Sequence, residues 1–249
     1  MKNRSLPLLY LLLTVLIVAS LFSGQLVLTQ TPWSVVVGTV ICIVLSLLLA
    51  TLPAYVLAAC VVGIVPAPKW VINLTQYIAY LVAGMPSILI GVIGFQVFCR
   101  WMGLGWSLLA SILTLNLLLF PTLLTAFIQL LQPVGDKYLD LAKSYRISLA
   151  GFLFLLIPKL YRKQMLEILT FGMSRGLGDT AAIMLTSGAL LEMPSSLFDS
   201  VRLLNFHIYM LAMEVPGGMN EAKTLSLWVV VIIFSLLFIP RLIGNKAYE

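Results

Sequence analysis

One stretch of the chain combines an apolar background with a cation and an anion whose spacing suggests chemistry. Residues 172–189 are mostly apolar or small, but they include Arg175 and Asp179, four positions apart. On a continuous helix this spacing places both side chains on one face. An ion within a membrane is costly, so both side chains should face a protein interior or a watery path, and such residues are functional by default.

The two side chains suit the passage of an anion. A guanidinium offers a planar fork of donors that matches an oxyanion, and a nearby carboxylate balances its charge when no anion is present. The sequence therefore predicts an anion pathway with Arg175 and Asp179 as transport residues. The alternative is an ion pair that satisfies itself and holds two helices together.

The same stretch is rich in small residues, for which close helix packing is the better interpretation. They are Gly172, Gly176, Gly178, Ala181 and Ala182.

A second pattern, Gly-x-Ser-x-Gly around Ser174, matches that of a serine nucleophile. That pattern needs a strand-to-helix turn, whereas here it lies within an expected helix, and His207, the only histidine, is expected in a loop. We interpret the match as accidental, and an intramembrane serine hydrolase is kept as the rival class. No catalytic residues are predicted. No metal-binding residues are predicted either, because no spacing of His, Cys and acidic residues resembles a metal site.

Composition places these residues in a membrane. Of the 249 residues, 61% are hydrophobic and 10% are charged, and no charge occurs between Arg4 and Lys69. About 20 apolar residues suffice for one crossing. An all-α polytopic membrane protein is predicted, and a soluble enzyme is excluded. Nucleic acid is not an expected partner, because the basic residues are scattered between apolar runs.

The apolar runs predict about six transmembrane helices and two divisions of the chain. The first division is an N-terminal helix with an outer loop at 1–33, kept as an uncleaved span, and the second is a transmembrane domain at 34–249. A kink or break is expected at Pro53, and re-entry is expected near Pro66, Pro68 and Lys69. The expected spans are 8–28, 34–62, 76–99, 106–131, 165–191 and 224–243.

Positive charges predict which side each connection occupies. The side shared by the two termini collects most of the Lys and Arg residues, against Arg100, Arg202 and Lys223 on the other, so both termini are expected in the cytoplasm. With this orientation, we expect 132–163 to be a structured cytoplasmic connection and 192–223 to be a sizeable outer loop.

Three segments together resemble the permease subunits of bacterial phosphate-specific ABC importers, the PstA/PstC type. Gly178-Asp-Thr-Ala-Ala182, following Arg175, is similar to the family's Arg-x-x-Gly-Glu-Thr-Ala segment, with Asp179 in place of Glu. Ala83 to Gly91 resembles its Ala-Gly-x-Pro-Ser-Ile-x-x-Gly segment, and Leu115 to Thr122 its apolar run ending in Leu-Pro-Thr. The resemblance covers residues 34–240.

This resemblance implies a type I (MetI-like) importer fold and a set of partners. They are a second permease subunit, two cytoplasmic ATPases that hydrolyse ATP, and a periplasmic or lipid-anchored binding protein. The chain itself is then a transporter subunit of the bacterial inner membrane, not an enzyme, with no cofactor of its own. The resemblance implies phosphate as cargo and a role for Arg175 and Asp179 in its passage. Molybdate, tungstate and sulfate stay open, because one guanidinium attracts them all.

The resemblance also implies an ATPase-coupling motif of the Glu-Ala-Ala type, in which a Gly follows the Glu and an apolar-Pro pair comes later. This motif is degenerate here. Counting back from Ile157-Pro158 puts Leu139 at the motif's Glu and Tyr145 at its Gly, while a shift by one residue offers Asp140 and Ala142. The segment from Asp136 to Gly151 has a largely apolar side that could dock an ATPase. An amphipathic helix on the membrane surface is the alternative.

Overall fold

The computed structural model describes residues 32–179 and 181–243, which form helices and no strand. The predicted all-α membrane fold is therefore confirmed. In this part of the chain, three helices are long and apolar enough to cross a membrane, or four if one bent pair counts as a span. They are α2 (Trp33–Val61), α11 (Met219–Ile243) and the first part of α5 (Leu108–Ser144). The first expected span, 8–28, lies outside the described residues.

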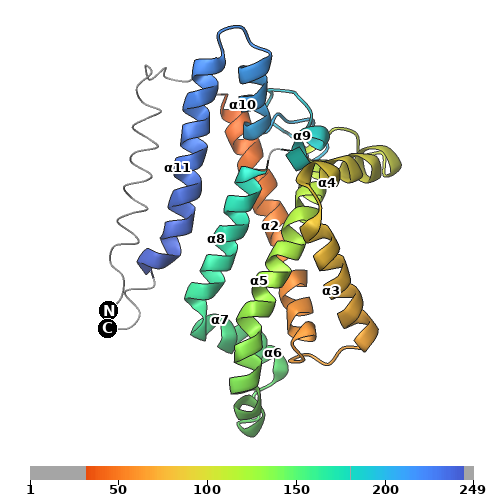
Figure 1. The fold of residues 1–249 in the computed structure, drawn as a ribbon, viewed down its shortest axis with the longest axis vertical. Coiled ribbons are helices and arrows are strands. Elements are labelled where there is room, and N and C mark those ends of the chain that lie inside the picture. The colour runs from red at the N-terminus through yellow and green to blue at the C-terminus, as the bar shows by residue number, and fades with distance from the viewer. Residues whose placement is uncertain (1–31, 180, 244–249) are drawn as a thin grey trace.

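Helices α2 and α5 pack together along the centre of the fold (Figure 1). Both are strongly apolar, and a row of small residues on α2, including Ala50, Ala54 and Ala58, is fully buried. Small side chains allow two membrane helices to approach closely. Across the interface, Ser46 donates a hydrogen bond to the Ile112 carbonyl at 3.0 Å. α2 continues through Pro53 as one helix, so the alternative of a break there is wrong.

The span expected at 76–99 is two helices bent by 111°. Helix α3 (Lys69–Gly84) begins where re-entry was expected, after a connection at 62–68, and α4 (Ser87–Gly94) follows the bend and runs into the π-helical turn η1 (Phe95–Trp101). Pro86 causes the break, because it lacks an N–H and forces the preceding residue out of the helical region. Met85 is accordingly extended, at φ −79° and ψ 138°.

Helix α5 runs thirteen residues beyond the end of the span expected at 106–131. The first part of the expected cytoplasmic connection, 132–163, is therefore a continuation of a span. The chain turns at Arg146, whose φ is 54°, and continues as the short helices α6 (Leu149–Gly151), η2 (Phe152–Leu156) and α7 (Ile157–Leu160). Tyr55 anchors this connection to α2 by donating to the Leu153 carbonyl at 2.8 Å.

The last third of the chain surrounds the helix that carries Arg175. Helix α8 (Arg162–Gly178) packs against α2, α5 and, most extensively, α11 (Figure 1). It stops at Gly178, and α9 (Ala181–Ser187) follows, so the single span expected at 165–191 is wrong. The expected outer loop at 192–223 contains α10 (Leu204–Met213) and the first turn of α11.

Candidate transport site

Arg175 and Asp179 lie at a break between two helices. Arg175 is in the last turn of α8, whereas Asp179 has left the helix, with φ −94° and ψ 97°. The Asp179 carboxylate accepts a hydrogen bond from the Ala182 backbone N–H at 3.3 Å. It thereby caps α9, as acidic residues do at helix N-termini. The expectation that the two charges share one face of a continuous helix is wrong, because capping the second helix requires Asp179 to leave the first.

The structure nevertheless brings both side chains to one cavity, which we name the Arg175 hollow. Its volume is about 450 Å³, and α11 supplies the opposite wall through Ile233 and Leu237. Its remaining lining residues are Phe171, Ser174, Arg175, Gly178 and Asp179.

Arg175 is exposed, and its guanidinium makes no hydrogen bond or ion pair with any residue that the structure describes. The alternative of a self-satisfied Arg175–Asp179 pair is therefore wrong for this conformation. The donor fork is open to a ligand that enters the hollow, and an oxyanion matches its geometry.

The small residues behind the site differ in what they do. A Cβ at Gly172 would lie 2.8 Å from Leu47 and 3.1 Å from Leu123, so α8 packs there closely on α2 and α5. Ala182 is fully buried. Gly178 has only Ile233 near it, at 3.9 Å, and it lies on the hollow's wall. The packing interpretation is confirmed for Gly172 and Ala182, whereas Gly178 faces the hollow.

Two contacts that the sequence did not reveal support the break. Asn205 of α10 donates its side-chain amide to the Leu177 carbonyl, which satisfies one backbone acceptor at the end of α8. Gly91 of α4 lies against the start of α9, where a Cβ would meet the Ala181 carbonyl oxygen at 2.8 Å. Only a glycine allows α4 to cross so close to α9. Gly91 therefore contributes to the position of the α9 backbone that follows Asp179.

The residues of the rival serine hydrolase do not form a catalytic pair. The Ser174 hydroxyl donates to the Thr170 carbonyl at 2.7 Å, within α8. His207 is buried on α10, and its Nδ1 has no hydrogen-bond partner. Burial lowers the pKa of His207, and the positive charge of Arg202 adds to this effect, against an opposing contribution from Glu221. No bond joins Ser174 to His207, so the Gly-x-Ser-x-Gly match has no catalytic geometry. Across the described ranges, no three His, Cys, Asp or Glu side chains gather as a metal site.

The four candidate coupling residues separate into inward and outward pairs. Leu139 and Ala142 line a cavity of about 270 Å³ together with residues of the two neighbouring connections, such as Ile64 and Phe152. Asp140 is exposed, and Tyr145 lies just beyond α5 with 78% of its surface exposed. The continuous apolar side expected of this segment is therefore divided, because α5 ends at Ser144.

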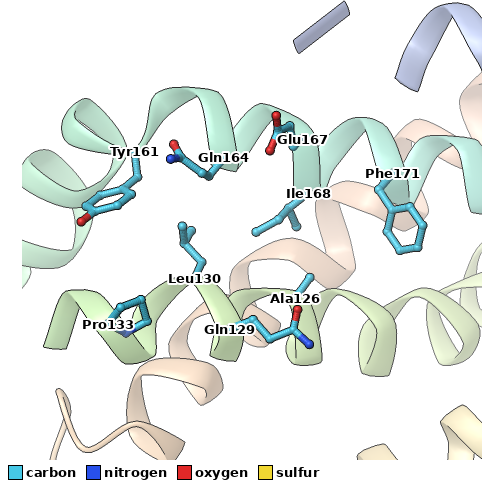
Figure 2. A pocket seen from close by; sticks show the side chains of 9 residues that line it. All are labelled: Ala126, Gln129, Leu130, Pro133, Tyr161, Gln164, Glu167, Ile168 and Phe171. Atoms are coloured by element: carbon cyan, nitrogen blue, oxygen red, sulfur yellow. The ribbon is translucent and has the colours of Figure 1, made fainter. Parts of the chain in front are cut away.

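A third cavity, the Glu167 hollow, lies between α5 and α8 (Figure 2). Its volume is about 490 Å³. Beside apolar residues it is lined by the polar side chains of Gln129, Tyr161, Gln164 and Glu167. Glu167 was not among the predicted site residues, although an acidic residue inside the span expected at 165–191 is a signal for a functional side chain.

No family model matches the chain. The chain is 26% identical over 183 residues to a Bacillus subtilis protein named as the probable ABC transporter permease YqgH, a match that covers 70% of this chain and 58% of that protein. It is also 26% identical over 167 residues to a Methanocaldococcus jannaschii protein named as the probable phosphate transport system permease PstA. This match covers 67% of this chain and 59% of that protein. The chain spans less than two thirds of the length of these relatives.

Proposed function

We propose that this chain is the membrane-embedded permease subunit of an ATP-driven ABC importer, and that its cargo is inorganic phosphate. The observation that carries the proposal is the guanidinium of Arg175, which pairs with no residue in the described ranges and lies at a helix break, beside Asp179, in an open cavity within an apolar fold. The two distant relatives named as permeases support the same conclusion, and one of them is named for phosphate transport.

The chemistry of the Arg175 hollow supports an oxyanion as cargo. A guanidinium binds a tetrahedral oxyanion through two parallel N–H donors. The Arg175 fork carries one positive charge and has no competing partner among the described residues. The break between α8 and α9 also matches transporters that bind substrates between discontinuous helices.

Exposed polar groups support a partner permease. Gln164, Glu167 and Arg175 lie on the exposed face of α8. Such side chains are too costly to leave against lipid, so protein or water must cover them. We assign this face to the passage between this chain and a second permease subunit. Tyr145 and Asp140 are exposed where an ATPase would bind, and 192–223 would meet a binding protein on the outer side.

An uptake assay tests the function and the site together. Cells starved of phosphate, with and without this gene, are given labelled phosphate with or without excess molybdate, tungstate or sulfate. Deletion should abolish the uptake supplied by this system, and the unaltered chain should restore it. Arg175→Ala should fail to restore it while the complex assembles normally. Lys69→Ala removes an exposed positive charge at the start of α3 and serves as the matched control.

The outcomes separate cargo from function. Loss of molybdate, tungstate or sulfate uptake instead of phosphate uptake would retain the permease and replace its cargo. Full uptake by Arg175→Ala would remove the site. Unchanged uptake of every anion after deletion would contradict the permease itself.

A further inference from the structure

After Arg162, the exposed residues of α8 form one continuous line along the helix. Residues 164, 167, 171, 175 and 178 are exposed and succeed one another at intervals of three or four. Residues at this spacing share one helix face. At 1.5 Å per residue, Glu167 and Arg175 lie about 12 Å apart along the axis. This face carries Glu167 of one hollow and Arg175 of the other.

Phe171 divides that line into two compartments. It lines the Arg175 hollow on one side and the Glu167 hollow on the other, and its side chain is 46% exposed. An anion that moves along α8 from Arg175 towards the first turn of the helix therefore passes Phe171 and then reaches Glu167.

The Glu167 hollow contains hydrogen-bonding groups that have no partner in the described part of the chain. Gln164 and Glu167 come from α8 and Gln129 from α5, and Leu130 and Ile168 approach each other between the two helices (Figure 2). None of the three polar side chains makes a hydrogen bond or ion pair with another described residue. Lys163, one helical turn before Glu167, does not pair with it either.

A carboxylate on an anion passage constrains the cargo. An ionised Glu only accepts hydrogen bonds, whereas amides both donate and accept. Hydrogenphosphate carries an O–H that can donate to the carboxylate and acceptor oxygens that can take the amide N–H groups. Sulfate and molybdate carry no such proton at neutral pH, so the carboxylate repels them without compensation. A site built around a substrate hydroxyl strongly rejects analogues that lack it.

We infer that Glu167, with Gln164 and Gln129, forms a second binding station of the passage, which selects oxyanions that carry a hydroxyl. This inference rests on the proposed function. Arg175 attracts any oxyanion in this scheme, and the Glu167 hollow discriminates among those that pass Phe171.

The test is competition for labelled phosphate uptake by the complete transporter in cells that lack other phosphate uptake systems. Glu167→Gln retains the size of the side chain and removes its charge. In this variant, sulfate and molybdate should inhibit phosphate uptake at concentrations roughly ten-fold lower or more, which corresponds to the loss of one discriminating charged contact. Arsenate, which bears a hydroxyl, should inhibit the variant and the unaltered protein alike.

Two further variants keep the test decisive. Lys69→Gln removes an exposed charge at the start of α3, far from the hollow in sequence, and should leave the inhibition profile unchanged. If Glu167→Gln fails to assemble, Gln129→Leu tests the opposite wall, and it should reduce phosphate uptake at low concentration. Unaltered protein that transports no phosphate contradicts the proposed function. Phosphate uptake with the same sulfate and molybdate inhibition in Glu167→Gln, or unaltered uptake in assembled Gln129→Leu, contradicts the station alone.

Discussion

The interface between α2 and α5 and the exposed face of α8 differ in the polarity of their side chains and in whether those side chains have partners. Along α2 and α5 the buried residues are apolar or small, and their few polar groups are bonded internally, as Ser46 is to the Ile112 carbonyl. Along α8 the exposed positions include Glu167 and Arg175, whose side chains have no partner in the described chain. The first region needs nothing more to be stable, whereas the second is complete only with a ligand, water or another subunit.

This difference separates the variants into two classes. Changes at the interface should alter the amount and stability of folded transporter before they alter transport. Changes on the exposed face of α8 should alter transport in a protein that folds normally. Gly172 and Arg175 lie three residues apart on the same helix and fall into different classes, so together they provide a close comparison.

The largest effect is expected from Gly172→Val. The added side chain would meet Leu47 and Leu123, whose atoms already lie 2.8 and 3.1 Å from an ideal Cβ. Overpacking of this kind costs about 1–3 kcal/mol. The yield of intact complex in membranes and its thermal stability in detergent should both fall.

Gly178→Val is the matched control, because a Cβ there has only Ile233 within 4 Å, at 3.9 Å. It should assemble normally. Equal losses of intact complex and of thermal stability in both variants would show that valine in this helix, and not the contact with α2 and α5, causes the defect.

Arg175→Lys should produce a smaller effect that appears only in transport. Lysine retains the charge but replaces the planar fork with a point charge. Phosphate uptake should fall roughly ten-fold at limiting concentration, as expected when one of two parallel hydrogen bonds is lost. The melting temperature of the complex should not change. Unaltered uptake would indicate that charge alone suffices at this position.

Two variants of Asp179 separate the effect of its charge on transport from the effect of its cap on α9. Asp179→Ala removes the acceptor for the Ala182 N–H and should cost about 1 kcal/mol of stability. Asp179→Asn retains an acceptor and removes the charge. Both should reduce uptake, but only the alanine variant should lower the melting temperature. Full uptake by Asp179→Asn would assign Asp179 to the structure of the break and not to the passage.

The sequence sufficed for elements that depend on local signals. The span expected at 34–62 is α2 (Trp33–Val61), because a long apolar run lies between Pro32 and Gly63. The position of Arg175 in a protein cavity was also predicted, because an ion in an apolar run has few other places to lie.

Features that depend on distant contacts were not predictable in this way. The break after Gly178 depends on the cap at Ala182, on Asn205 from α10 and on the crossing of Gly91 over α9. None of these contacts leaves a periodic trace in the sequence. Glu167 was missed for a different reason, because next to Lys163 it resembles the polar end of a span until α5 is placed opposite it.

The smallest effect concerns His207, at the end of the molecule where α10 meets α11. Burial and Arg202 lower its pKa in the folded protein from the usual 6.5. Below that value the unfolded chain binds the proton more readily than the folded chain does, so stability falls as the pH falls. The complex should therefore melt a few degrees lower at pH 5.5 than at pH 7.5. His207→Phe removes the titrating group and should reduce this difference, whereas an unchanged difference would assign the pH dependence to other groups.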